Sequence, residues 1–236
     1  MGQKVSPTGF RLGVTEDWRS RWYSDKDYAK NLENDLAIRS YLDKQLAHAA
    51  VSRVEIERAG DKIKVIITTS RPGVVIGKKG AEVDALRKKL NQIANGLVSV
   101  EVVEVKRPEL DASLIAQSVA EQLENRVAFR RAMRKAVQSA RKSGAKGIRI
   151  QCAGRLGGAE MSRREWYREG RVPLHTLRAK IDYGFATAAT TMGSIGIQVW
   201  VYHGEVLPGQ KAPQPALEGS SRPNRSRRRN NDRGDK

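Results

Sequence analysis

The chain has 236 residues, 39% of them hydrophobic, which is enough to form the core of one large domain or of two ordinary ones. Lys and Arg number 44 against 26 Asp and Glu, and the resulting net charge of +18 favours a polyanionic partner, with nucleic acid first and an anionic membrane surface second. Cys152 is the single cysteine, which excludes a disulfide framework, and no apolar run approaches the roughly 18 residues that span a bilayer.

Two further classes lose support from particular residues. The first residues of the chain lack the hydrophobic stretch of a signal peptide. The nitrogen and sulfur ligands that zinc prefers are scattered without the spacing of a metal site. We therefore predict neither a metal nor a cofactor on His48, Cys152, His175 and His203.

The first 107 residues predict an arm followed by a small α/β unit. Residues 1–24 contain Pro7, Gly9 and Gly13 without a sustained apolar period, and we expect an extended arm there. Helical and alternating spacings of apolar residues then succeed one another along the chain. The expected elements are a helix over 28–50, strands over 51–58 and 62–69, a short helix over 74–76, a helix over 81–95 and a strand over 97–105.

The second part begins after the break at Arg107-Pro108, where Asp111 is expected to cap the next helix. On a helical wheel, the apolar residues of 112–127 and those of 129–140 occupy arcs that differ by about a third of a turn. One straight helix cannot bury both arcs, so we predict two helices with a break near residues 127–129. Period-two alternation then predicts strands over 148–152, 163–171, 177–185 and 195–202, with Cys152 buried as a small hydrophobe.

Positive charge is concentrated on the second of these helices. Residues 126–149 contain nine Lys and Arg and no Asp or Glu. A solvated face that only keeps a helix soluble is the alternative, but such faces normally carry acidic partners three or four residues away. A single-sign row favours a phosphate backbone, and we predict a nucleic-acid-facing helix surface. Opposite the apolar stripe lie Arg130, Arg131, Arg134, Lys135, Arg141 and Lys142.

A glycine loop follows the short helix of the first unit. Gly73-Val74-Val75-Ile76-Gly77-Lys78-Lys79 differs from a phosphate-binding P-loop, because three residues separate its glycines and Lys79 stands where a metal-binding hydroxyl is needed. Gly77-Lys78-Lys79-Gly80 instead matches the GXXG loop that clamps single-stranded nucleic acid in a KH domain. The order of the surrounding elements is the type II arrangement. A purely structural glycine pair between two helices is the alternative.

Several longer stretches make the chain resemble a known family, the bacterial small-subunit ribosomal protein three family. The resemblance reaches from the N-terminus to about residue 208, and the tail beyond it is not diagnostic. Besides the KH loop, the stretches that carry it are Gly2-Gln3-Lys4-Val5, Arg11-Leu12-Gly13, Lys106-Arg107-Pro108-Glu109-Leu110, Phe129-Arg130-Arg131-Ala132-Met133, Gly154-Arg155-Leu156-Gly157-Gly158-Ala159-Glu160 and Glu165-Trp166-Tyr167-Arg168-Glu169-Gly170-Arg171-Val172-Pro173-Leu174.

The resemblance implies a non-catalytic component of the small-subunit head in the cytoplasm. It implies binding to small-subunit ribosomal RNA, packing against small-subunit proteins ten and fourteen, and a place along the channel where messenger RNA enters. Arg130, Arg131, Arg134 and the adjacent Lys135 would face the messenger and help to unwind it; some relatives have Lys at position 134. A free KH protein that regulates messenger RNA is the alternative function, and a DNA-repair enzyme is a further rival without assignable catalytic residues.

The expected organisation is α+β, with four segments. These are an arm over 1–24, a type II KH domain over 25–107, a domain of two helices and four strands over 108–207, and a disordered basic tail over 208–236. A second cluster of bases surrounds Trp166 and Tyr167, two aromatic residues that could alternatively fill the core. We expect ribosomal RNA contacts from Arg141, Lys142, Arg155, Arg163, Arg164, Arg168 and Arg171.

Overall fold

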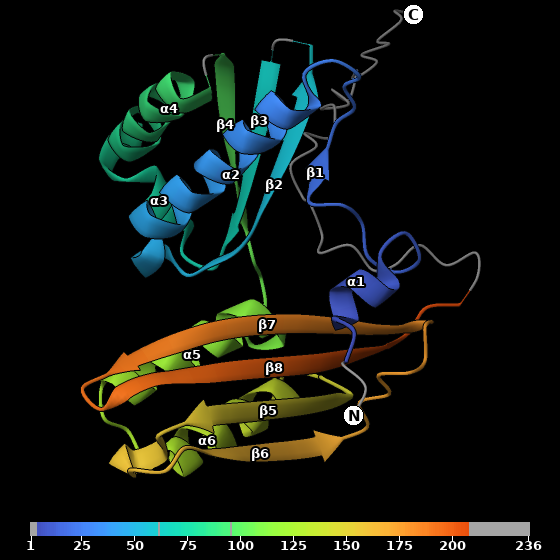
Figure 1. The fold of residues 1–236 in the computed structure, drawn as a ribbon, viewed down its shortest axis with the longest axis vertical. Helices are drawn as coiled ribbons and strands as arrows, with labels where there is room; N and C mark the ends of the chain where they lie inside the picture. The colour runs from blue at the N-terminus through green and yellow to red at the C-terminus, as the bar shows by residue number, and fades with distance from the viewer. Residues whose placement is uncertain (1–3, 61, 95, 208–236) are drawn as a thin grey trace, which may run out of the picture.

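The molecule contains two sheets, which lie one above the other along its long axis (Figure 1). Helices cover one face of each sheet. The computed structural model describes residues 4–60, 62–94 and 96–207. Among these residues, no helix combines the length and the apolar character that crossing a membrane requires. The predicted tail over 208–236 lies outside the described residues.

The upper sheet belongs to the KH domain and has the strand order β1-β2-β3-β4. Strands β2 and β3 are antiparallel, and β4 adds to β3 in parallel. The order α-β-β-α-α-β that defines the type II KH fold is confirmed. Its elements are α2 (Tyr28–Gln45), β2 (Val51–Ala59), β3 (Lys62–Thr69), α3 (Pro72–Ile76), α4 (Ala81–Ala94) and β4 (Leu97–Glu104), with single 3-10 turns at Ala47–Ala49 and Lys78–Gly80.

Helix α2 exposes its first two leucines and buries a carboxylate. Leu32 and Leu36 are 41% and 58% exposed, whereas Asp35 is only 1% exposed. The buried carboxylate is fully partnered: it accepts hydrogen bonds from the Arg58 guanidinium at 2.6 Å and from the Trp22 indole at 2.8 Å. A polar residue can face inward here because β2 and the arm bring two donors to it.

The segment predicted as an extended arm contains a short helix, α1 (Pro7–Arg11), and a short strand, β1 (Ser20–Arg21). Strand β1 pairs in parallel with β2 of the KH sheet. Helix α1 packs against the lower domain, where Arg11 is completely buried. The arm therefore contacts both domains, and β1 forms because β2 offers it backbone partners.

The lower domain places two helices on one face of an antiparallel sheet with the order β6-β5-β8-β7. Helix α5 covers β7 and β8, and α6 covers β5 and β6. Together with the KH domain, this confirms the predicted α+β class. The elements are α5 (Ala112–Glu124), α6 (Phe129–Lys142), β5 (Gly147–Gly154), β6 (Arg163–Gly170), β7 (Ala179–Thr190) and β8 (Gly193–Glu205), with 3-10 turns at Pro108–Leu110 and Leu156–Gly158.

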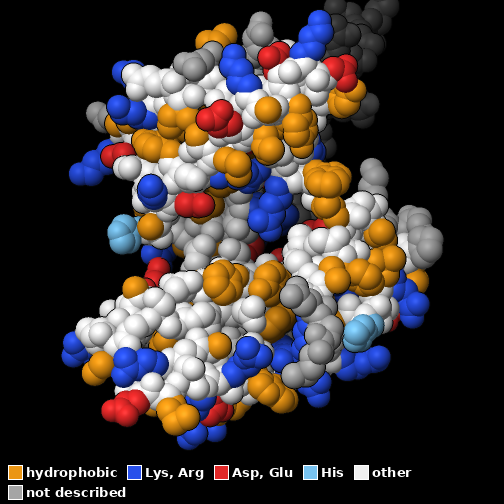
Figure 2. Space-filling view, viewed as in Figure 1, with side chains coloured by type: hydrophobic (Ala, Val, Ile, Leu, Met, Phe, Trp, Pro, Cys, Tyr) orange, Lys and Arg blue, Asp and Glu red, His pale blue; other side chains and the backbone are white. Residues whose placement is uncertain are grey.

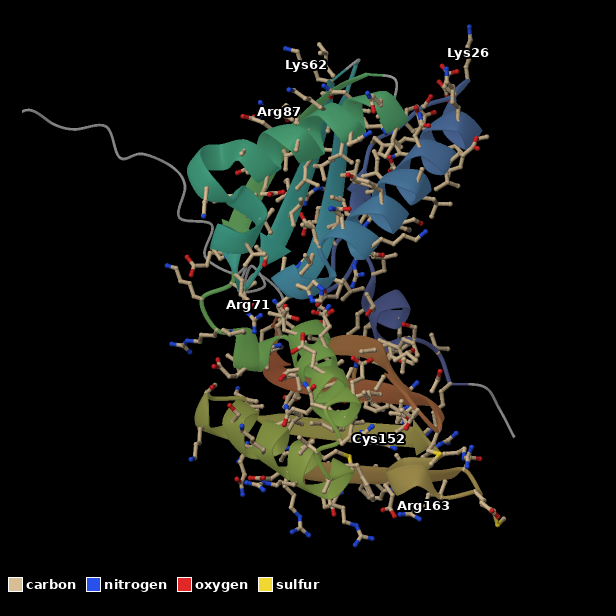
Figure 3. The ribbon with its side chains drawn as sticks, turned by 90° about the vertical axis from the view of Figure 1, so that its left-hand side faces the viewer. Lys26, Lys62, Arg71, Arg87, Cys152 and Arg163 are labelled. Carbon is tan, nitrogen blue, oxygen red and sulfur yellow. The ribbon has the colours of Figure 1, made fainter. Side chains whose placement is uncertain are left out.

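Three local predictions for this domain are confirmed. Asp111 caps α5 by accepting from the backbone N–H groups of Ser113 and Leu114. The helices are separate, since α5 ends at Glu124 and the chain turns through Arg126, whose φ is +59°. Cys152 is fully buried between sheet and helices (Figure 3), and burial raises its pKa to about 12, so the thiol stays protonated.

Candidate nucleic-acid interface

Helix α6 separates an apolar face from a basic one. Its inward face inserts Ala132, Met133, Val137 and Ala140 into the core of the lower domain. The bases of the predicted surface are all exposed along the opposite face: Arg130, Arg131, Arg134, Lys135, Arg141 and Lys142. The helical period alone produces this separation, because residues three and four apart share a side.

Within residues 4–60, 62–94 and 96–207, five of these six basic residues form no ion pair. They are Arg130, Arg131, Arg134, Lys135 and Lys142. Arg141 differs, because strand β6 supplies Glu169 at 3.3 Å and its guanidinium also donates to the Ala145 carbonyl at 2.7 Å. Helix α6 itself contains no acidic residue, as the sequence shows, and the partner of Arg141 comes from another element.

Two aromatic rings of the lower domain hold the arginines of this surface. Phe129 lies between Arg130 and Arg163, each 5.6 Å from its ring centroid. Arg134 lies 5.6 Å from the ring of Tyr167 and lines a shallow groove of about 150 Å³ between α6 and β6. Contacts of this kind restrict guanidinium groups while leaving their N–H donors available to phosphate.

The KH loop joins α3 to α4 with two glycines in left-handed conformations. Gly77 has φ +70° and ψ −177°, a region that only glycine occupies readily, and Gly80 has φ +82°. Lys78 is exposed beside them. Two apolar residues of α3, Val74 and Ile76, are 53% and 42% exposed next to the loop. This apolar flank of the loop was not predicted from the sequence as part of the site.

Strand β6 distributes the second predicted arginine cluster over both faces of the sheet. Arg163 faces α6, where it contacts Phe129, and Tyr167 packs on the same side against the core. Alternation then directs Arg164 and Arg168 to the opposite face. Trp166 shares that face and is 54% exposed, so the alternative that it fills the core is wrong.

The two remaining arginines of the cluster lie at the ends of the sheet. The Arg155 guanidinium donates to the carbonyls of Ala159 and Met192, each at 2.9 Å, and thereby holds the turn after β5. Arg171 is exposed and lines an open pocket of about 440 Å³ together with Lys146 and Tyr202. Arg163 therefore lies beside α6, and Arg164 and Arg168 lie on the opposite face of the sheet. Arg155 stabilises a turn.

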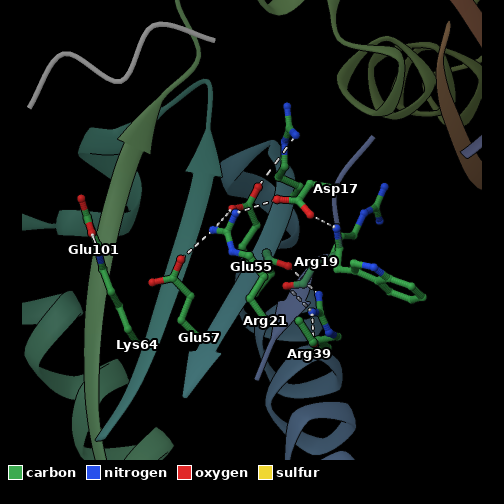
Figure 4. Close-up of polar contacts among 12 residues, drawn as sticks. Asp17, Arg19, Arg21, Arg39, Glu55, Glu57, Lys64 and Glu101 are labelled. Carbon is green, nitrogen blue, oxygen red and sulfur yellow. Dashed lines mark hydrogen bonds and ion pairs between the residues drawn. The ribbon is translucent and has the colours of Figure 1, made fainter. Parts of the chain in front are cut away.

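The helix-free face of the KH sheet carries paired charges of both signs (Figure 4). Arg21 forms ion pairs with Glu55 at 2.9 Å and Glu57 at 2.7 Å, and Lys64 pairs with Glu101 at 2.7 Å. Carboxylates at this density repel phosphate, so this face of the KH domain does not favour RNA.

A KH domain joined to a domain with an exposed basic helix face defines an RNA-binding protein. The comparisons agree: the family model "KH domain" matches residues 37–110, and "Ribosomal protein S3, C-terminal domain" matches residues 119–201. The small ribosomal subunit protein uS3 of Geobacter sulfurreducens is 63% identical over 211 residues, 89% of this chain and all of that protein. Its counterpart in Syntrophus aciditrophicus is 60% identical over 211 residues, 89% of this chain and 98% of that protein.

The chain therefore belongs to the small ribosomal subunit protein uS3 family. Membership confirms the expectation of an RNA-binding ribosomal component with a structural rather than an enzymatic role.

Proposed function

We propose that this protein sits in the head of the small ribosomal subunit and lines the channel through which messenger RNA enters. Its partners are small-subunit ribosomal RNA, messenger RNA and the small-subunit proteins ten and fourteen, and it acts in the cytoplasm. The observation that supports this proposal best is the basic face of α6, where Arg130, Arg131, Arg134 and Lys135 are exposed without ion pairs among the described residues.

The proposed mechanism is electrostatic. Cations on one rigid helix attract the phosphates of an incoming strand, and each contact releases condensed counterions. Because the guanidinium groups of Arg130 and Arg134 are held by Phe129 and Tyr167, they contact phosphate with a small loss of side-chain freedom. Single-stranded RNA approaches this narrow row more closely than a duplex does, so the surface favours the open strand while the moving ribosome supplies the work of unwinding.

In this proposal the KH loop and the remaining basic residues also bind RNA. Gly77, Lys78, Lys79 and Gly80 of the KH loop bind RNA of the particle, as do Arg141, Lys142, Arg155, Arg163, Arg164, Arg168 and Arg171. For Arg141 and Arg155, part of the guanidinium is already engaged by protein oxygens, so their contribution to RNA binding is smaller than that of Arg164 or Arg168.

The test replaces Arg130, Arg131 and Arg134 by Ala and measures translation rate against the stability of a hairpin in the message. Ala is a good helix former and the buried stripe is unchanged, so folding and incorporation should survive. We expect near-normal translation of unstructured messages and progressive slowing as the hairpin becomes more stable. Equal slowing at every hairpin stability would contradict the unwinding role.

A control with the same change in net charge is available on the KH domain. Lys26, Lys62 and Arg87 are exposed at the end of that domain remote from the lower domain (Figure 3). Replacing these three by Ala should leave the dependence on hairpin stability unchanged. The alternative of a free regulatory KH protein predicts a different sedimentation: such a protein would not travel with small subunits in moderate salt.

A further inference from the structure

We propose that the helix-free face of the lower sheet is a second RNA-binding surface, which binds unpaired bases by stacking and is separate from the α6 face. The proposal goes beyond the messenger-binding role of α6, because it concerns another face, other residues and another mode of recognition. The strand register determines which side chains share this face.

The register places twelve side chains of this face in three rows across the sheet, from β6 to β7. The rows follow from the pairs Arg149↔Arg168, Gln151↔Trp166 and Ala153↔Arg164 and from their continuation through β8. The first row is Arg168, Arg149, Trp200 and Tyr183; the second is Trp166, Gln151, Gln198 and Phe185; the third is Arg164, Ala153, Gly196 and Thr187.

The composition of these rows suits RNA. They contain three arginines, four aromatic rings and two glutamines, and no carboxylate. The helix-free face of the KH sheet instead pairs its basic residues with Glu55, Glu57 and Glu101. Positive and negative charges therefore balance on the KH face, whereas the rows of the lower face carry only positive charge, so the lower face attracts phosphate more strongly.

Two rings project from the ends of the middle row. Trp166 is 54% exposed on β6, and Phe185 is 58% exposed on β7. Three strand spacings separate them, about 14 Å at roughly 4.8 Å per step. Exposed rings of this size on a flat sheet provide stacking platforms for unpaired bases, and the edges of the rows carry Arg164 and Arg168 for the adjoining phosphates.

The surface between the rings is already ordered. The Arg149 guanidinium lies between Trp166 and Trp200, at 5.4 Å and 5.0 Å from their ring centroids. Gln151 donates to Gln198 at 3.1 Å, and Gln198 donates to the Tyr183 hydroxyl at 3.2 Å. These contacts hold Trp166 and the floor beside it in one arrangement, which lowers the entropy cost of binding.

The protein covers the apolar end of the same face with its own chain. Ile181 and Tyr202 pack there against Val172 and Leu174, next to the buried Arg11 of α1. In Figure 1 this helix-free face is turned to the viewer, and in Figure 2 hydrophobic and basic side chains are mixed on its coloured part. A protein partner is the competing occupant, but the excess of arginine over carboxylate favours a polyanion.

The test uses the full-length chain and measures binding of a labelled, unstructured 12-nucleotide oligouridine. Trp166→Ala should weaken binding about 5- to 150-fold, the range for loss of one stacked base, while Trp166→Phe should retain most of the affinity. The salt dependence of Trp166→Ala should equal that of the parent, because no charge is removed. Trp18→Ala is the matched control, since Trp18 is 62% exposed in the arm.

A second oligomer separates stacking from charge. The second oligomer is an abasic ribose-phosphate chain of the same length. Trp166→Ala and the parent should bind it with equal affinity. The ratio of the oligouridine affinities of the parent and Trp166→Ala should stay the same when Arg130, Arg131 and Arg134 are replaced by Ala. This result does not depend on whether α6 binds messenger RNA. Unchanged affinity of Trp166→Ala for oligouridine, or ultraviolet cross-links from Trp166 to a protein instead of RNA in small subunits, would overturn it.

Discussion

Gly77 and Gly80 have the same residue type and a similar positive φ, yet their surroundings differ. A Cβ on Gly77 would lie 2.3 Å from Cγ and 2.7 Å from Cβ of Glu82, whereas a Cβ on Gly80 would meet nothing within 4 Å. The spacing of the GXXG motif treats both positions alike. The structure therefore leaves no room for a side chain at Gly77 and leaves open space at Gly80, where the proposed RNA binding can be tested separately.

Changing Gly77 to Ala is expected to lower the free energy of unfolding by about 1–3 kcal/mol, because a strained backbone region and the contact with Glu82 act together. Gly80→Asp is expected to cost less stability and to weaken RNA binding by placing a carboxylate at the loop. Urea unfolding and RNA titration of both variants check this. Equal losses of stability, or full RNA affinity of Gly80→Asp, would contradict the assignment.

His203 on β8 provides a pH dependence. Burial and the neighbouring Lys180 lower its pKa to about 4, against the opposing effect of Asp111. As the pH falls from about 6.5 toward 4, the unfolded chain takes up a proton that the folded chain refuses, so stability is lost in this window. Burial raises the pKa values of Glu16 and Asp111, and protonation of these carboxyl groups favours the folded chain as the pH falls. Because this effect opposes that of His203, the contribution of His203 is measured by comparing the parent with a variant.

We expect the parent to lose about 1–2 kcal/mol more stability between pH 7 and pH 5 than His203→Gln does. Urea unfolding at the two pH values measures this difference, in which the effects of the carboxyl groups largely cancel. Identical losses in both chains would show that His203 titrates at its ordinary pKa.

At the scale of elements, alternation and helical period determine which basic side chains share an exposed face. Helix α6 keeps its bases on one side because its apolar residues recur every three or four positions. Strand β6 instead assigns Arg163 and Arg164 to opposite faces of the sheet, although they are adjacent in sequence. The turn between α5 and α6 sets the rotation that brings both helices onto one sheet.

Arg126 in that turn has φ +59°, which costs an L-residue about 1 kcal/mol. Arg126→Gly is therefore expected to raise the free energy of unfolding by about 1 kcal/mol. Arg126→Ala removes the same exposed side chain without relieving the backbone and is expected to leave stability nearly unchanged. Thermal or urea unfolding distinguishes the two, and a gain from Ala equal to that from Gly would attribute the effect to charge.

At the scale of the whole molecule, the arm joins the two domains. Strand β1 extends the KH sheet, and the buried Arg11 guanidinium donates to the carbonyls of Ala179 at 2.6 Å, Leu174 at 3.0 Å and Thr176 at 3.1 Å. These carbonyls lie more than 160 positions away in sequence. The relative placement of the KH loop and α6 depends on such contacts.

Arg11→Ala leaves several buried carbonyls without donors and is expected to lower the free energy of unfolding by about 3 kcal/mol. Arg19→Ala removes an exposed arginine of the same arm and is expected to change it by less than about 0.5 kcal/mol. Urea unfolding compares them. Equal effects of the two substitutions would mean that the arm does not hold the lower domain.

Local pattern was sufficient for the KH order, the GXXG loop, the cap at Asp111, the break between α5 and α6 and the burial of Cys152. Each of these depends on residues within one or two turns or strands, where backbone periodicity decides which side chains share a face. The basic surface of α6 was predictable for the same reason.

Only the tertiary structure decided which polar residues are used internally. Asp35 faces inward because Trp22 and Arg58 reach it, Arg141 is neutralised by Glu169, and Arg155 is engaged by the carbonyls of a turn. The open face that carries Trp166 and Phe185 likewise exists only once β6 and β7 stand at opposite edges of one sheet. Partners distant in sequence determine these outcomes, because burial and pairing depend on which elements meet in space, and no local period records that.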